Sequence, residues 1–181
     1  MKFKLLAVLL FYFSFTTIAQ KPAKMGTSKY LDEKRGFKNI ILNSDISSIE
    51  KDIVETKDTT MGIMPGVKFF EIINSEMKKI GDKAEIKKII VGSFNGKIAI
   101  ISMTLDKPNG SIMNETFKEA YGSGYKPNQF MEKWIWSSKN VMLVLDIDGL
   151  RVDTILMADR PLWAEIEKYG KEAAKKSVKD I

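Results

Sequence analysis

The chain has 181 residues, of which 29 are basic and 23 acidic, and it contains neither histidine nor cysteine. Without these residues the chain has no Ser-His-Asp or Cys-His nucleophilic site and no histidine-ligated zinc or haem, and we expect no metal and no cofactor. The missing cysteine also excludes disulfides and a lipid-bearing cysteine. Only three basic residues are arginines and the basic residues are dispersed, so we expect no nucleic-acid surface.

The first nineteen residues predict a cleavable export signal. Lys2 and Lys4 flank the start of an unbroken apolar run, residues 5–13, and the residues that follow become smaller and more polar. Cleavage is expected after Ala19. The run is much shorter than the ~20 apolar residues of a membrane-spanning helix. We therefore expect a periplasmic or secreted protein with no stable membrane insertion after cleavage. The absence of disulfides favours a bacterial source.

The rest of the chain predicts a mobile arm followed by one domain. Residues 20–36 are polar and lysine-rich without a sustained apolar period. Residues 37–181 are expected to form one α+β domain, with a mainly antiparallel sheet of about six strands and the helices on one face. Its parts 37–106 and 111–160 have the order of a two-fold α-β-β-β repeat, and a C-terminal helix closes the chain.

In the first of these parts, Ser47-x-x-Glu50 matches a capping box and predicts a short amphipathic helix after a strand at Ile40–Leu42. A further strand is expected over Val67–Ile73. The clearest signal is Asn95-Gly96 between two β-prone runs, which favours a two-residue type I′ hairpin turn because both turn residues need positive φ.

In the second part, Ser111 and Gly122 delimit a predicted helix over 112–121. Three strands are expected after it, over the ranges 130–136, 141–147 and 150–158. A tight turn at Asp148-Gly149 would place Asp146 opposite Arg151. Pro161 is suited to the first turn of the last helix.

The layout resembles tandem helix-plus-sheet modules of the bacterial envelope. It is similar to the secreted β-lactamase-inhibitor protein and to the small lipoprotein subunit of the outer-membrane β-barrel assembly machine. The segment Phe117–Gly122, with Pro127 behind it, is loosely similar to the helix, glycine turn and proline of the latter family. The lipid-attachment cysteine is missing, and the spacing from glycine to proline is longer. The resemblance implies a non-catalytic binding or assembly role.

An exported hydrolase is the alternative function. It would use paired carboxylates, as glycosidases do, or a Ser-x-x-Lys pair. That pattern occurs at Ser48, Ser75 and Ser123, each with a lysine three residues later, which is near its chance frequency. Asp146 and Asp148 have the spacing that opens a calcium loop, but the later ligands are absent. We interpret these two residues as parts of a hairpin.

An aromatic face is the candidate partner-binding site. Phe130, Trp134 and Trp136 have the same parity on a predicted strand and so would share one face of it. Tyr121 and Tyr125 would extend this surface. Large aromatic side chains of this kind bind peptides, glycans or partner loops, but they also form cores. From the sequence we favour a core role for the stripe and expect a non-catalytic module whose partner is another envelope protein or a peptide.

Overall fold

The computed structural model describes residues 23–57, 61–80, 84–107, 109–149 and 152–177. The predicted cleavage after Ala19 lies outside these residues. The elements are α1 (Ser28–Lys34), β1 (Gly36–Phe37), β2 (Ile40–Ile41), the 3-10 helix η1 (Ile46–Asp52), β3 (Ile53–Thr56), β4 (Val67–Ile72), the 3-10 helix η2 (Ser75–Lys78), β5 (Lys79–Ile80), β6 (Ala84–Phe94), β7 (Lys97–Asp106), α2 (Asn109–Tyr121), β8 (Lys133–Ser137), β9 (Val141–Asp146), β10 (Val152–Asp159) and α3 (Arg160–Ser177).

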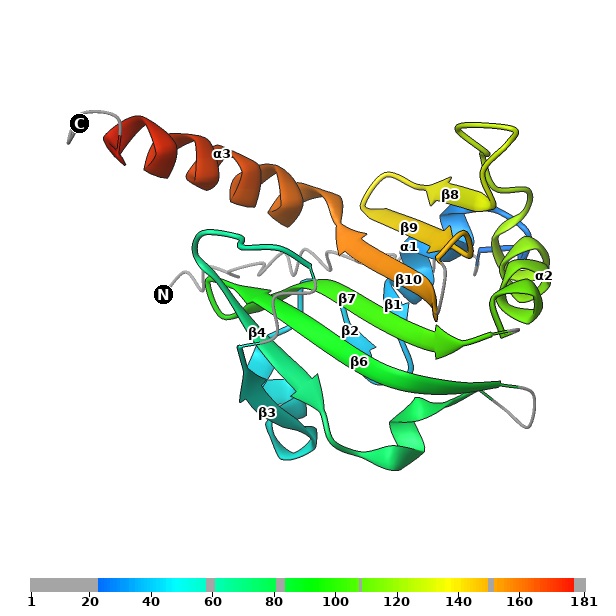
Figure 1. Cartoon of the computed structure of the whole chain (residues 1–181), viewed down its shortest axis with the longest axis horizontal. Coiled ribbons are helices and arrows are strands. Elements are labelled where there is room, and N and C mark those ends of the chain that lie inside the picture. The colour runs from blue at the N-terminus through cyan, green and yellow to red at the C-terminus, as the bar shows by residue number, and fades with distance from the viewer. Residues whose placement is uncertain (1–22, 58–60, 81–83, 108, 150–151, 178–181) are drawn as a thin grey trace, which may run out of the picture.

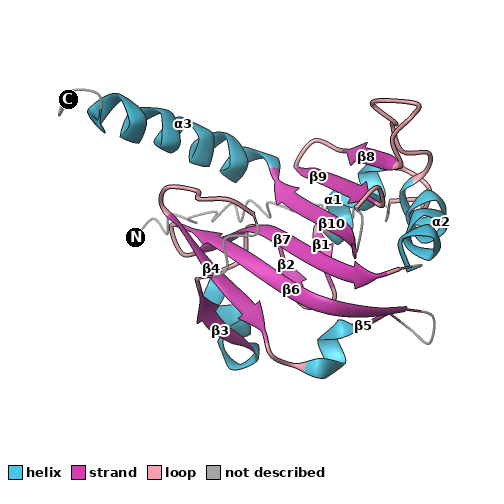
Figure 2. Cartoon of the chain, viewed as in Figure 1, coloured by secondary structure: helices cyan, strands magenta, loops and turns pink. Residues whose placement is uncertain are grey.

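One large antiparallel sheet forms the frame of the protein (Figures 1 and 2). Its strand order is β3-β4-β6-β7-β10-β9-β8, and β5 also pairs with β6. The strands β1 and β2 form a separate small ribbon. The predicted α+β class with a mainly antiparallel sheet and a C-terminal helix is confirmed. The strand β8 lies at one edge of the sheet.

The main core lies between one face of this sheet and the helices α1 and α2. It combines sheet residues such as Ile101 and Leu143 with Leu31 of α1 and with Met113 and Phe117 of α2. These two helices lie on one face, as expected. The prediction of helices on one face only is wrong for α3, which packs on the opposite face, where its residues Leu162 and Ile166 form a second cluster with Phe94, Ala99 and Ile100.

The hairpin and the end of the second helix follow the sequence predictions, but this helix begins at Asn109, so Ser111 lies inside it and does not precede it. Asn95 and Gly96 have φ values of 50° and 76°, and they join β6 to β7 with Phe94 opposite Lys97. The helix α2 ends at Tyr121, and Gly122 follows it with φ of 83°. Both turns require positive φ values, which glycine and asparagine adopt at low cost.

The predicted mobile arm contains a packed helix, so packing begins before Gly36. The side chain of Thr27 caps α1 by accepting a hydrogen bond from the Tyr30 amide at 3.3 Å, and Leu31 is 0% exposed. Gly26 donates to the Ala120 carbonyl at 2.8 Å. A helix of seven residues with one buried apolar side chain gives no repeating apolar pattern in the sequence. Its stability comes from contacts that are distant in sequence.

The second tight turn was predicted in the wrong register. Asp146 pairs with Thr154, not with Arg151, which lies outside the described residues. The cause is visible at Asp148, whose carboxylate accepts a hydrogen bond from the Glu132 amide at 2.9 Å. The Ile147 amide also donates to the Glu132 carbonyl at 2.9 Å. The residues that follow β9 therefore stay bonded to the residue before β8, and the chain turns later than predicted.

The two-fold repeat is not confirmed. The helix predicted from the capping box is the 3-10 helix η1, whose N-cap is Asp45 with no side-chain capping bond. Its counterpart α2 is a regular helix of 13 residues. The first part of the chain also contributes the extra elements η2 and β5.

Candidate functional site

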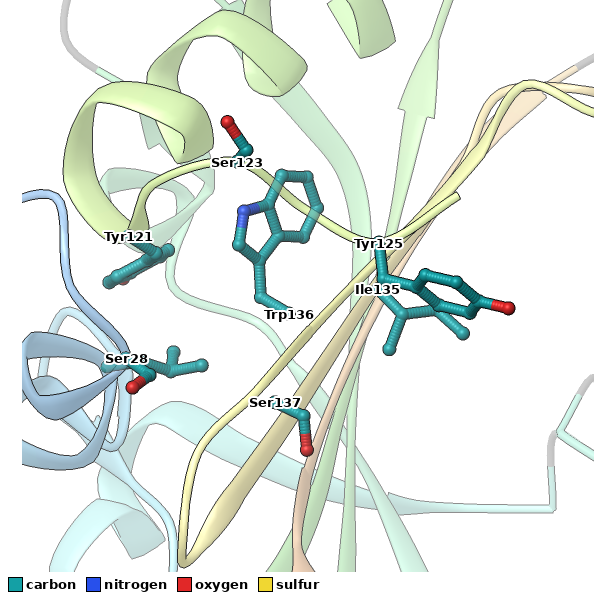
Figure 3. A pocket seen from close by; sticks show the side chains of 8 residues that line it. Ser28, Tyr121, Ser123, Tyr125, Ile135, Trp136 and Ser137 are labelled. Carbon is teal, nitrogen blue, oxygen red and sulfur yellow. The ribbon is translucent and has the colours of Figure 1, made fainter. Parts of the chain in front are cut away.

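A cavity of about 420 Å³ lies beside the edge strand β8, between α1 and the end of α2 (Figure 3). The described residues that line it are all uncharged: Ser28, Leu31, Tyr121, Ser123, Tyr125, Ile135, Trp136 and Ser137. Such a mixture of apolar and hydroxyl groups is typical of sites that bind neutral groups. Three of the residues predicted from the sequence as a partner-binding face therefore meet at one place.

Trp136 forms the fixed floor of the cavity. Its side chain is 4% exposed, and its Nε1 donates to the Gly122 carbonyl at 2.7 Å. Its ring meets the ring of Phe117 edge-on, with 5.5 Å between centroids. A Cβ atom on Gly124 would come within 2.8 Å of the indole. The loop after α2 therefore lies directly on the ring, and a bound partner would meet a preorganised surface.

Tyr121 forms a wall at the end of α2. Its ring lies 6.1 Å from Tyr30 of α1 and 5.9 Å from Phe117, so the three rings join the two helices. Burial, with a smaller contribution from Tyr30, raises the pKa of the Tyr121 hydroxyl above its ordinary value. The hydroxyl therefore stays protonated at neutral pH, which keeps this wall uncharged.

Tyr125 closes the cavity on the β8 side. Its amide donates to the Ile135 carbonyl and the Ile135 amide donates to the Tyr125 carbonyl, both at 2.8 Å. This isolated bridge adds one residue to the outer edge of β8. The Tyr125 side chain is 67% exposed and points away from the sheet core (Figure 3). Next to it, Lys126 pairs with Glu132 at 2.7 Å and lies over the Trp134 ring.

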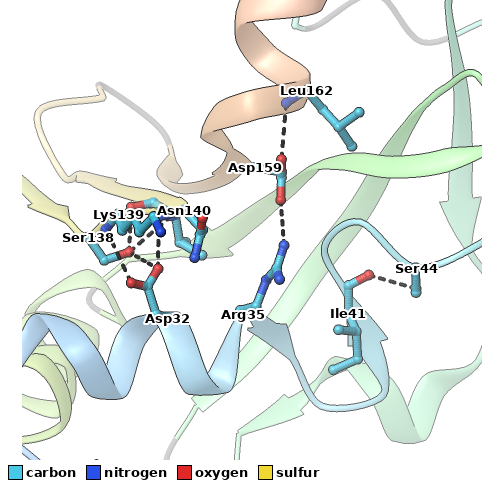
Figure 4. Close-up of polar contacts among 10 residues, drawn as sticks. Asp32, Arg35, Ile41, Ser44, Ser138, Lys139, Asn140, Asp159 and Leu162 are labelled. Carbon is cyan, nitrogen blue, oxygen red and sulfur yellow. Dashed lines mark hydrogen bonds and ion pairs between the residues drawn. The ribbon is translucent and has the colours of Figure 1, made fainter.

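The α1 wall is fastened at the level of Asp32 (Figure 4). The Asp32 carboxylate accepts hydrogen bonds from Ser138 Oγ at 2.6 Å, the Asn140 amide at 2.8 Å and the Lys139 amide at 3.2 Å. Partial burial raises the pKa of Asp32, but these hydrogen bonds and the Arg35 charge outweigh it, so the pKa lies below its ordinary value. The ionised carboxylate therefore holds α1 on the turn between β8 and β9.

A second fastening joins α1 to the start of α3. Arg35 follows α1 and donates to the Asp159 carboxylate at 2.8 Å, and the Asp159 side chain is completely buried. The other oxygen of Asp159 accepts the Leu162 amide at 3.0 Å and so caps α3. Arg160 donates to the Ser138 carbonyl. These bonds, drawn in part in Figure 4, fix the position of α1 relative to the sheet.

Phe130 and Trp134 lie apart from the cavity. The strand β8 begins at Lys133, so Phe130 is in the preceding loop and is 85% exposed. The Asn128 side chain accepts the Phe130 amide at 3.0 Å, and this local turn keeps the chain from extending. Trp134 shares the face of Trp136, as the parity predicted, and packs against the main core.

Three other lining residues had no distinct signal in the sequence: Ser28, Leu31 and Ser137. Ser123 was considered only for its Ser-x-x-Lys pattern. Leu31 is a lone apolar residue in a polar segment. The threonine that caps α1 is the one local sign that a helix begins there. These residues reach the cavity through contacts between α1, α2 and β8 that no local pattern encodes.

Three of the residues considered for catalysis or for a calcium loop have other partners: Ser48, Lys126 and Asp146. Ser48 donates to the Asp45 carbonyl, and Lys126 is paired with Glu132, away from Ser123. Asp146 pairs with Lys133 at 3.2 Å. Among the described residues, no group of three or more acidic side chains has the arrangement of a metal site. In the same part of the chain, no helix is long and apolar enough to cross a membrane.

Comparison of the chain with protein-family models, curated proteins and solved structures gives no match. The resemblance in layout to envelope modules therefore stays a prediction, and the cavity beside β8 is the feature from which function is inferred.

Proposed function

We propose that this protein is a non-catalytic, exported binding module of the bacterial envelope, and that it holds its partner in the cavity beside β8. The observation that carries the proposal is that Tyr121 and Trp136 line one uncharged cavity, with Tyr125 at its β8 edge. Aromatic side chains with few rotamers bind partners with little loss of entropy. The proposal of export rests on the predicted signal in the first nineteen residues.

The rigidity of the cavity supports a binding role. Its floor is held by the bond from Trp136 to Gly122, and its α1 wall by Asp32 and Arg35. A wall that does not need to be ordered on binding lowers the entropic cost of association. Among the residues that the structure describes, the lining has no carboxylate and no lysine, the groups that a carboxylate or Ser-Lys hydrolase would use. The chemistry of the lining thus favours binding over hydrolysis.

A cavity-filling variant tests the proposal. Ser28→Trp places a large side chain on an exposed lining position, while Lys29→Trp places the same side chain on the adjacent exposed position outside the cavity. The three immobilised proteins are compared for the envelope components that they retain from an extract. We expect Lys29→Trp to retain what the unaltered protein retains and Ser28→Trp to lose it. Equal retention by both variants would contradict a partner site in the cavity.

A further inference from the structure

The loop before β8, residues 125–132, holds several large apolar side chains in solvent. It runs from the edge of the cavity to the start of β8 and rises clear of the sheet (Figure 1). Phe130 is 85% exposed, Tyr125 is 67% exposed and Met131 is 38% exposed. Large apolar side chains that gather at one exposed place are typical of contact surfaces, whereas single ones are ordinary.

Polar contacts close the neck of this loop. Lys126 pairs with Glu132 at 2.7 Å, and the Lys126 ammonium lies 5.1 Å from the centre of the Trp134 ring. The Glu132 amide donates to the Asp148 carboxylate, and the Glu132 carbonyl accepts the Ile147 amide, both at 2.9 Å. The loop is therefore fastened to the segment that follows β9.

A second set of hydrogen bonds fixes the tip of the loop. The Asn128 side-chain oxygen accepts the Phe130 amide at 3.0 Å, and the Asn128 carbonyl accepts the Met131 amide at 3.1 Å. In such a turn the asparagine side chain replaces a backbone partner. The backbone of Phe130 is thus held in place while its ring stays in water. A contact residue that is already ordered loses little entropy on association.

The charges around the loop favour a protein surface over a lipid surface. Lys126 is paired with Glu132, Lys133 is paired with Asp146, and Asp148 adds a further negative charge. These residues have no excess of positive charge that would attract an anionic bilayer. Without a basic patch, even a whole lipid chain gives only marginal membrane binding, and one phenylalanine is smaller. In a protein interface, a single buried aromatic side chain can supply much of the affinity.

We propose that loop 125–132 is a second contact with the partner, and that Phe130 inserts into an apolar pocket on a partner protein. This inference rests on the proposed function and names the partner class, a folded protein. Tyr125 connects the two contacts, since it stands at the β8 edge of the cavity and also begins the loop. Phe130 is the anchor of the second contact, and the uncharged residues Asn128 and Gln129 lie at the polar rim around it.

The test is photocrosslinking in intact cells with a benzophenone analogue of phenylalanine. The analogue replaces Phe130, Ser123 of the cavity or, as a control, Ile63, which is 89% exposed between β3 and β4. We expect positions 130 and 123 to give adducts with the same protein, identified by mass spectrometry, and position 63 to give none.

Two alanine variants then measure the contribution of the anchor. With the analogue at position 123, Phe130→Ala should lower the adduct yield by about tenfold or more, because the loss of a central aromatic contact weakens binding by at least that factor. Ile63→Ala should leave the yield unchanged. Both side chains are exposed, so both variants should keep the urea midpoint of the unaltered protein, which separates lost binding from lost folding.

Four outcomes would overturn the inference. The first is no adduct from position 130, and the second is an unchanged yield from position 123 in Phe130→Ala. The third is an adduct of position 130 with a second copy of the chain. The fourth is sedimentation with vesicles of phosphatidylethanolamine and phosphatidylglycerol that Phe130→Ala abolishes, since the loop would then bind lipid.

The result at position 123 separates this inference from the proposed function. If position 123 still gives an adduct with a partner protein in any of the four cases, the partner site in the cavity stands and only the second contact fails. If neither position 123 nor position 130 gives an adduct, both proposals are contradicted.

Discussion

Replacing Asp32 by asparagine should loosen α1 from the turn between β8 and β9. The carboxylate accepts three hydrogen bonds there, from Ser138 Oγ and from the amides of Lys139 and Asn140, at 2.6 to 3.2 Å. Asparagine has nearly the same shape, but it offers one acceptor oxygen and turns an amide group toward donors. Hydrogen bonds to a charged group contribute about 1.5–3 kcal/mol each. Asp32 is only partly buried and water replaces part of the loss, so we expect about 2 kcal/mol.

Urea unfolding followed by tryptophan fluorescence at neutral pH measures this loss. Glu33→Gln is the matched control, because Glu33 is the adjacent residue and its hydrogen bond is to the exposed amide of Ala23. The control should change the free energy of unfolding by less than about 0.5 kcal/mol. Equal midpoints for Asp32→Asn and the unaltered protein would refute the assigned role of Asp32.

The dependence of this difference on pH has a definite sign. The pKa of Asp32 is lower in the folded state than its ordinary value. Its stabilisation is therefore complete above the pKa of the unfolded state and is lost as the pH falls through the pKa of the folded state. The difference between the unaltered protein and Asp32→Asn should shrink on acidification. A difference that grows on acidification would contradict the assignment.

Two further substitutions probe the floor and the second fastening of the cavity. Trp136→Ala should lower the free energy of unfolding by about 3–5 kcal/mol, measured by urea unfolding followed by circular dichroism, because a buried indole and its bond to Gly122 are lost. Trp136→Phe should cost less, since it keeps most of the buried area. Asp159→Ala should cost about 3–5 kcal/mol, measured by thermal unfolding, because Arg35 loses its buried partner and α3 loses its cap.

The sequence predicts those parts of the fold that a local backbone demand fixes. Asn95-Gly96 requires two positive φ values, and the hairpin that it joins lies at the centre of the sheet. Gly122 marks the end of α2 for the same reason. The register between β9 and β10 is not local, since the Asp148 side chain reaches across to the Glu132 amide. A dipeptide signal for a turn at Asp148-Gly149 carries no information about that bond.

In the candidate site too, the sequence indicates some of the residues and gives no sign of others. Tyr121, Tyr125 and Trp136 stand out as large aromatic residues near one loop, and they meet around one cavity. Phe130 was grouped with them by parity, but the Asn128 turn places it outside β8. Leu31 was missed because its segment is polar, and its helix depends on contacts with α2, about 90 residues further along the chain.

Photocrosslinking in intact cells tests the central claim most directly. A benzophenone amino acid is introduced in place of Ser123, which lines the cavity, and in a second strain in place of Thr116, which is exposed on α2 away from it. A partner held beside β8 predicts a crosslinked adduct from position 123 and none from position 116. Adducts of equal yield from both positions, or an adduct from position 116 alone, would contradict the assignment of the partner site to this cavity.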